Sequence, residues 1–341
     1  MKALVYAGPG RKVIEDRPKP EIRAPGDAIV RMLKTTLCRT DLHILKGEVR
    51  SCAPGCILGL EGVGIIDSVG DGVSSYLPGD HVLISCISSC GACFYCRRGM
   101  YSNCTTGGWL LGHRIDGTQA EYVRIPHADF SLYPVPDGEN EKAVMKLGDI
   151  LPAGPEIDSV HSKVAIVGCG EVGLATLLTA GFYSPAAIIM IDPDEGRLEI
   201  ARRLGATATV NSTDGKAVET VKALVGCQGV DTVIKAAGAP ATLALCQELA
   251  GPGRVIANLG FHARKAAMHL EQLWSQNMAV TTRLFAPGQT RKDKSGQGES
   301  TRPVTRQFTL DKILDAYDTF EKASGNRPLK IIISVPPSLT L

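Results

Sequence analysis

Residues 163–192 read KVAIVGCGEVGLATLLTAGFYSPAAIIMID, and this stretch decides the fold of the second half of the chain. An apolar run, Val164–Val167, is followed by glycines with the spacing G-x-G-x-x-G and by an apolar segment of helical length, 172–182. A second apolar run, 187–191, leads directly into Asp192. This order of a strand, a glycine turn, a helix and a second strand that ends in an acidic residue predicts a dinucleotide-binding βαβ unit.

The glycine turn and the acid have separate roles in this unit. Gly168 permits the tight turn, and Gly170 lets backbone N–H groups approach a pyrophosphate at the positive end of the helix. The expected cofactor contacts of this turn are Gly168, Gly170, Glu171, Val172 and Gly173. Asp192 can accept hydrogen bonds from both ribose hydroxyls and would repel a 2′-phosphate, which favours NAD(H) over NADP(H). The plainer alternative is that the glycines only serve helix packing.

Length and composition narrow the class of protein. The chain has 341 residues, enough for about two domains, and a net charge of +2 that favours neither nucleic acid nor membrane as a partner. Its first residues, MKALVYAGPG, lack the features of a signal peptide, and no apolar run has the length of a membrane helix. Together with clustered cysteines, these features predict a cytoplasmic protein.

Periodicity predicts an α/β protein with two kinds of domain. Residues 1–150 contain short apolar runs separated by Pro-Gly and Gly-rich turns, which indicates a β-rich domain. From 155 to 285 strands and helices alternate, as in a doubly wound parallel sheet. A polar loop is expected over 287–306 and a helix over 309–323, with Thr309 as its cap. The apolar face of this helix is expected to hold Ile313, Leu314, Tyr317 and Phe320.

Four cysteines have the spacing of a metal site. Cys90, Cys93 and Cys96 follow the pattern C-x2-C-x2-C, and Cys104 comes eight residues later. Four thiolates can close a tetrahedral shell around zinc and leave no open position, so the expected ion is structural. An iron–sulfur cluster also uses such spacing, and unliganded cysteines are a further alternative.

With these features, the sequence resembles the zinc-dependent medium-chain alcohol dehydrogenases. The resemblance rests on CRTDLH (38–43), GLEGVG (59–64), the cysteine lobe, GDILP (148–152) and the glycine fingerprint with its acid. It implies a GroES-like catalytic domain over 1–152 with a zinc lobe at 86–105, a Rossmann domain over 153–285, and a return to the catalytic domain over 286–341. It also implies a homo-oligomer, either a dimer or a tetramer.

The resemblance assigns expected roles to individual residues. Cys38 and Asp149 resemble ligands of a catalytic zinc, and Glu61 resembles an acid beside the metal that can move in as a ligand. Thr40 resembles the hydroxyl that takes the proton of the substrate alcohol, and His43 the next station toward solvent.

Three further residues match positions near the cofactor or the substrate. Arg39 resembles a residue that contacts the cofactor pyrophosphate, and Arg197 the basic partner of the adenosine ribose. Trp109 matches a segment near the substrate pocket, and core filling is its plainer interpretation.

One residue departs from the family pattern. The family motif is G-H-E with a zinc-binding histidine, and this chain has Leu60 in its place. An isobutyl group binds no metal, and Asp41, which orients that histidine in the family, loses its usual partner. Either Cys38, Glu61 and Asp149 hold zinc more weakly, or the catalytic site is empty.

Three functions are therefore compared. The first is an NAD(H)-dependent alcohol dehydrogenase or carbonyl reductase that acts on a small-molecule alcohol or carbonyl compound. The second is a zinc-independent reductase or specialised-metabolite enzyme of the same fold. The third is a non-enzymatic dinucleotide-binding protein.

Overall fold

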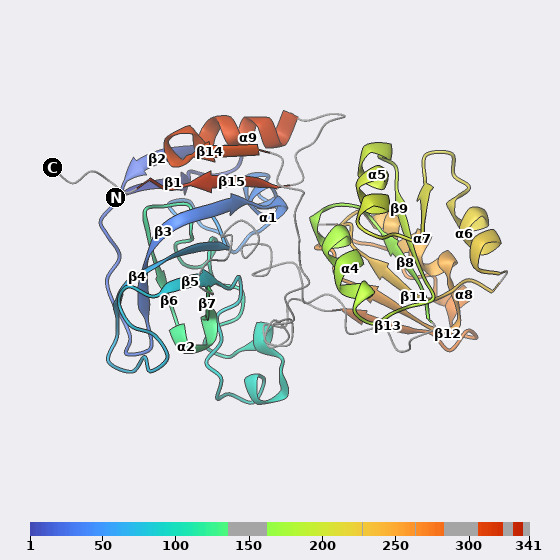
Figure 1. Ribbon diagram of the computed structural model, residues 1–341, viewed down its shortest axis with the longest axis horizontal. Coiled ribbons are helices and arrows are strands. Elements are labelled where there is room, and N and C mark those ends of the chain that lie inside the picture. The colour runs from blue at the N-terminus through green and yellow to red at the C-terminus, as the bar shows by residue number, and fades with distance from the viewer. Residues whose placement is uncertain (136–161, 227, 263, 283–305, 323–329, 337–341) are drawn as a thin grey trace. The chain divides into compact units, whose positions relative to one another are not determined.

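The structure is a computed structural model that describes residues 1–135, 162–226, 228–262, 264–282, 306–322 and 330–336. The chain forms two compact units (Figure 1). The first unit comprises Met1–Asp149 and Phe285–Leu341, and the second comprises Ile150–Leu284. None of the described helices is long and apolar enough to cross a membrane.

The second unit contains a six-stranded parallel sheet. Its strands are β8 (Lys163–Val167), β9 (Ala187–Asp192), β10 (Ala208–Asn211), β11 (Val230–Lys235), β12 (Ala250–Asn258) and β13 (Ala279–Thr282). They are ordered β10-β9-β8-β11-β12-β13, so the order reverses at β8. This is the doubly wound arrangement that the sequence predicts. The interior of β8 is fully buried, as expected of a parallel strand covered on both faces.

The helices of the second unit connect these strands. They are α4 (Glu171–Gly181), α5 (Glu195–Arg203), α6 (Ala217–Val225), α7 (Pro240–Leu249) and the short α8 (Leu270–Leu273). Asp194 caps α5 by accepting a hydrogen bond from the Arg197 backbone N–H at 3.2 Å. Pro240 stands in the first turn of α7, where its missing N–H costs nothing. The expected alternation of strand and helix over 155–285 is thus confirmed in the described part of this range.

The first unit is built from strands of both ends of the sequence, and its described strand pairs are antiparallel except for β14 with β15, which is parallel. A two-stranded sheet pairs β1 (Lys2–Tyr6) with β2 (Lys12–Asp16). The larger sheet comprises β3 (Ala28–Leu37), β4 (Gly62–Val69), β5 (His81–Ile84), β6 (Tyr122–Ile125), β7 (Leu132–Pro134), β14 (Arg306–Thr309) and β15 (Ile331–Ser334). Its order is β14-β15-β3-β4-β5-β7, with β6 also paired to β3. The short helices are α1 (Arg39–Leu45), α2 (Ala128–Ser131), η1 (Cys96–Arg98) and η2 (Tyr101–Asn103).

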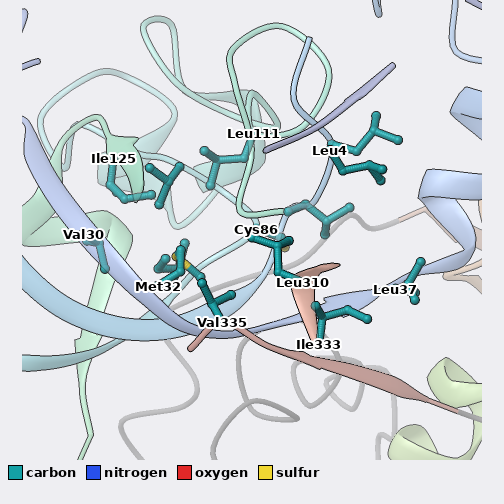
Figure 2. Close-up of a cluster of buried hydrophobic side chains, with 14 of the residues drawn as sticks. Leu4, Val30, Met32, Leu37, Cys86, Leu111, Ile125, Leu310, Ile333 and Val335 are labelled. Carbon is teal, nitrogen blue, oxygen red and sulfur yellow. The ribbon is translucent and has the colours of Figure 1, made fainter. Parts of the chain in front are cut away.

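The C-terminal segment completes the core of the first unit. β15 pairs antiparallel with β3, with Ile331 opposite Leu37. Figure 2 shows Leu310 and Ile333 among side chains contributed by the N-terminal part, such as Leu37. This core is apolar and buried, so the two sequence segments depend on each other for burial.

The C-terminal helix differs from its prediction in two respects. It consists of η6 (Leu310–Lys312) followed by α9 (Ile313–Lys322), and the Thr309 side chain makes no capping hydrogen bond. Ile313 and Tyr317 are buried, as predicted, but Leu314 is 37 % exposed and Ala316 fills the core instead. The buried stripe is therefore offset from the predicted face.

Several strands were not predicted from periodicity. β14 begins at Arg306, the last residue of the predicted polar loop, and its pattern RQFT has little apolar signal. Its strand conformation follows from pairing with β15, a long-range contact that no local pattern encodes. The remainder of that loop, 287–305, lies outside the described residues.

Candidate functional site

The first group of predicted site residues lies where β3 passes into α1. Cys38 is the N-cap residue of α1, and its backbone N–H donates to Asp41 Oδ2 at 2.8 Å. The Gln119 side-chain amide donates to the same oxygen at 3.1 Å. Tyr317 of α9 in turn donates to Gln119 Oε1 at 2.9 Å. The start of α1 is therefore anchored by a capping acid and by hydrogen bonds that reach the C-terminal segment.

The polar residues of α1 lie close to Cys38. Cys38 Sγ lies 3.6 Å from Thr40 Oγ1, and both residues are partly exposed. His43 Nδ1 contacts Glu48 Oε2, and about a quarter of each of these side chains is exposed, 27 % and 26 % respectively. A hydroxyl and an imidazole thus follow the thiol along one short helix, with the imidazole reaching toward solvent.

The two carboxylate oxygens of the buried Glu61 differ in their hydrogen-bond partners. Its side chain is 1 % exposed; Oε1 accepts a hydrogen bond from Thr36 Oγ1 at 2.6 Å and forms an ion pair with Lys330 Nζ. Oε2 has no hydrogen-bond partner among the described residues. Lys330 was not predicted as a site residue. The available signal was its position as a single charge directly before the apolar run III (331–333).

Asp41 also has an unsatisfied carboxylate oxygen. Asp41 Oδ1 is buried and has no hydrogen-bond partner among the described residues, while Leu60 is buried in the apolar core. The pKa of Asp41 is raised to about 7, mainly by burial and in part by the Glu61 charge, while the Cys38 backbone N–H and the Lys330 charge oppose the increase. An apolar residue at position 60 supplies no N–H for this oxygen, in agreement with the consequence expected of this substitution.

These observations test how well the site fits a catalytic zinc. A catalytic zinc takes three protein ligands and keeps one open position. The described residues provide the Cys38 thiol and the unpaired Glu61 oxygen, and Asp149 lies outside the described residues. Leu60 removes the imidazole. The donor set is therefore thiolate and carboxylate, which is a weaker match for zinc than a set that includes histidine.

The four-cysteine cluster fits a structural zinc. Among the described residues, only Cys90, Cys93, Cys96 and Cys104 bring three or more candidate ligands together, with ligand atoms within 4.8 Å of one another. Backbone N–H groups point at the sulfurs, for example Cys90 N to Cys104 Sγ at 3.3 Å. The N–H groups of Cys96 and Thr105 lower the pKa of Cys93 to about 5. N–H donors that stabilise thiolates are what a tetrahedral S4 zinc site requires.

The second group of predicted site residues lies at the carboxyl end of β8 and β9. Gly168 has φ +106°, a conformation that favours glycine. Asp192 is 4 % exposed; its Oδ2 accepts from the Cys169 backbone N–H at 2.7 Å and its Oδ1 from the Asp194 N–H at 2.9 Å. The acid is thereby fixed against the glycine turn. Arg197 Nε lies 3.9 Å from Asp194 Oδ2.

The structure distributes the predicted residues over both units. Cys38, Arg39, Thr40, His43 and Glu61 belong to the first unit, and the glycine turn with Asp192 and Arg197 belongs to the second. Arg39 is exposed. Trp109 lies partly buried and stacks on His113, with ring centroids 4.0 Å apart.

Comparison with known proteins identifies both halves of the chain. Residues 24–137 match the family described as alcohol dehydrogenase GroES-like domain, and residues 172–293 match zinc-binding dehydrogenase. An alcohol dehydrogenase of Cupriavidus necator is 35 % identical over 94 % of this chain and 95 % of its own. Zinc-type alcohol dehydrogenase B of Aspergillus flavus is 36 % identical over 94 % of this chain and 78 % of its own.

A solved structure shows the same architecture. Zinc-dependent alcohol dehydrogenase 2 from Streptococcus pneumonia, in its apo form, superposes with a TM-score of 0.92 at 45 % identity, covering 99 % of both chains. Full-length similarity at this identity, together with the GroES-like and dinucleotide-binding halves and the four-cysteine cluster, establishes the family. The chain belongs to the zinc-type medium-chain alcohol dehydrogenases and is an alcohol dehydrogenase-like oxidoreductase.

Proposed function

We propose that this protein is an NAD(H)-dependent alcohol dehydrogenase or carbonyl reductase. The reaction is alcohol + NAD⁺ → carbonyl + NADH + H⁺, in which a hydride leaves the alcohol carbon for the nicotinamide. The observation that carries the cofactor assignment is the Asp192 carboxylate, buried at the tip of β9 and held by the Cys169 N–H of the glycine turn. A fixed negative charge there suits two ribose hydroxyls and opposes a 2′-phosphate.

We propose roles for the chain's own groups in this reaction. Thr40 Oγ1 would accept the proton of the substrate hydroxyl, because it is the hydroxyl that lies 3.6 Å from Cys38 Sγ. His43 would pass that proton to solvent, since its ring is partly exposed and contacts the Glu48 carboxylate. In the second unit, Gly168, Gly170, Glu171, Val172, Gly173, Asp192 and Arg197 would bind the dinucleotide, and Arg39 would contact its pyrophosphate.

We propose that a catalytic zinc, where bound, is held weakly by Cys38, Glu61 and Asp149. Zinc in such a site supplies Lewis-acid chemistry that lowers the pKa of the substrate hydroxyl. The free, buried Glu61 Oε2 supports this set, because Thr36 and Lys330 hold only the other oxygen. Cys90, Cys93, Cys96 and Cys104 would hold a second zinc that stabilises their lobe.

The competing function is a zinc-independent reductase of the same fold. It is favoured by Leu60 and by the ion pair of Glu61 with Lys330, since both reduce the number of side-chain atoms that are available as metal ligands. Metal analysis of the purified protein separates the two functions. About two zinc ions per chain supports the first, and about one supports the second.

A turnover experiment tests the proposed reaction. The zinc-loaded protein is incubated with NAD⁺ and a panel of primary and secondary alcohols, and with NADH and the corresponding carbonyl compounds. NADH absorbance should rise in the first series and fall in the second. Absence of turnover over the whole panel at full zinc loading contradicts the proposal.

We further propose a homo-oligomer located in the cytoplasm. Among the described strands, β13 pairs with β12 alone, and Val280 on it is 38 % exposed. Nearby in sequence, Leu270 and Trp274 are 62 % and 78 % exposed. An unpaired strand edge with exposed apolar side chains suits self-association. Light scattering gives the mass in solution, and a monomer would contradict this proposal.

A further inference from the structure

Lys235, the last residue of β11, is a fully buried lysine at 0 % exposure. Its Nζ lies 2.5 Å from the Ala237 carbonyl oxygen, 3.2 Å from Asn258 Oδ1 and 2.5 Å from His262 Nε2. All three partners belong to the ends of β11 and β12 or to the turns that follow them. A lysine without solvent contact at this place needs a physical explanation.

The surroundings of Lys235 suit a positively charged ammonium group. Three acceptors match its three N–H donors, with His262 accepting through Nε2. Burial and the neighbouring Lys235 charge lower the pKa of His262, so this ring stays neutral. Burial also lowers the pKa of Lys235 itself, and the nearby Cys246 opposes that effect. No carboxylate of the described residues forms an ion pair with Lys235, so its charge is solvated by dipoles and not neutralised.

Lys235 lies at the carboxyl end of the parallel strands, where a dinucleotide is expected to bind. It pairs in register with Asn258 at the carboxyl end of β12. The turn that follows it packs on the glycine turn, because a Cβ on Gly168 would lie 2.9 Å from Ala237 Cβ. Dinucleotides bind across the point where the strand order reverses, here β8. With Asp192 of β9 on the adenosine side, the nicotinamide half of a bound cofactor would lie on the side of β11 and β12.

We infer that Lys235 makes the cofactor site discriminate between redox states, binding NADH more tightly than NAD⁺. This rests on the proposed use of NAD(H). The two forms carry the same phosphates and differ by the positive charge of the oxidised nicotinamide. A fixed, buried positive charge on the nicotinamide side repels that charge and leaves NADH unaffected. Lys235 thereby favours the reductive direction at the binding step.

Dissociation constants of both cofactor forms test this inference. They are measured by calorimetry for the native protein and for Lys235→Met, and the quantity of interest is Kd(NAD⁺)/Kd(NADH). For two like charges about 12 Å apart and an effective dielectric constant near 20, the ratio should fall about tenfold in Lys235→Met. Lys235→Arg keeps the charge and should keep most of the native ratio. A structural disturbance that weakens the binding of NAD⁺ and NADH equally leaves this ratio unchanged.

Two further variants complete the experiment. Asn258→Asp places a carboxylate at the position of an atom that lies 3.2 Å from Lys235 Nζ, so it neutralises the charge with little change in shape. It should lower the ratio as Lys235→Met does, and it decides the question if Lys235→Met does not fold. Lys222→Met removes the same charge from the end of α6, near the amino ends of β8 and β11, and should leave the ratio unchanged.

The outcomes separate this inference from the proposed function. A native protein that prefers NAD⁺, or an unchanged ratio in Lys235→Met and Asn258→Asp, overturns the role of Lys235. If neither NAD(H) nor NADP(H) binds to the native protein, the proposed function itself fails.

Discussion

A Cβ atom added to Gly173 would lie 1.7 Å from the carbonyl oxygen of Gly168, so α4 and the turn before it are in direct backbone contact. We expect Gly173→Ala to push the helix away from the turn. The free energy of unfolding should fall by about 3 kcal/mol, and NAD(H) affinity should fall at least tenfold (~1.4 kcal/mol). Denaturant unfolding and calorimetry measure the two effects.

The same helix offers a matched control. A Cβ on Gly181 would meet no atom within 4 Å, and its backbone is not left-handed. Gly181→Ala should therefore stabilise the protein by up to about 1 kcal/mol through helix propensity and leave cofactor binding unchanged. Equal losses in both variants would show that the close contact has no special importance.

Leu60→His tests whether the missing imidazole limits activity. The new side chain can donate to the unpaired Asp41 Oδ1 and bind zinc with its other nitrogen. We expect the variant to keep more of its catalytic zinc than the native protein during dialysis against a weak chelator, and kcat/KM for alcohols to rise about 10–100-fold. The control is Leu60→Met, which keeps the site apolar. A histidine variant with native metal content would argue against a latent zinc site.

Cys93→Ser tests the structural role of the cysteine cluster. Loss of one of four thiolates should release about one zinc per chain and expose residues 88–108 to proteolysis, because an ion bound by the four cysteines would link segments of this lobe. Metal analysis and limited proteolysis measure the result. Cys56→Ser changes a partly buried thiol outside the cluster and should retain the zinc. Release of zinc from both variants would indicate general unfolding instead.

Asp192→Asn tests the cofactor preference. It removes the charge that opposes a 2′-phosphate, so the ratio of kcat/KM for NADP⁺ to that for NAD⁺ should rise about tenfold or more. Asp194→Asn is the matched control, since Asp194 caps α5 and asparagine also caps well. The control should leave the ratio unchanged, and a native protein that already prefers NADP⁺ would contradict the assignment.

The lowered pKa of His113 should reduce the stability of the protein in mild acid. Burial, and then the nearby Arg114 charge, lower the pKa of His113 to about 4, and Nδ1 has no hydrogen-bond partner among the described residues. The unfolded chain takes up this proton near its ordinary pKa of about 6.5, before the folded protein does. Stability should thus be full above pH ~6.5 and fall by about 1–3 kcal/mol as the pH decreases to ~4.

His113→Phe checks this linkage. Phenylalanine keeps an aromatic ring against Trp109, whose ring centroid lies 4.0 Å from that of His113, and it cannot be protonated. Denaturant unfolding at several pH values between 4 and 7 should show a shallower slope for the variant. Parallel slopes for the native protein and the variant would assign the acid sensitivity to other groups.

The fold was more predictable from the sequence than the site. Segments 163–192 and 90–104 carry local patterns whose geometry follows from the residues alone, and the structure has the strand, helix and cysteine cluster they predict. Lys330 and Lys235 could not be predicted, because each becomes significant through partners more than twenty residues away in sequence or across strands. Glu61 was predicted as a site residue, but its ion pair with Lys330 required the pairing of β15 with β3.

The shared construction of the first unit has a consequence during synthesis on the ribosome. β15, which pairs with β3, is translated after every other described element. The dinucleotide-binding unit, by contrast, is complete in one continuous segment before β14 is made. The emerging polypeptide should therefore fold its second unit first, while the edge of β3 that pairs with β15 stays exposed, where a chaperone can cover it until β15 is synthesised.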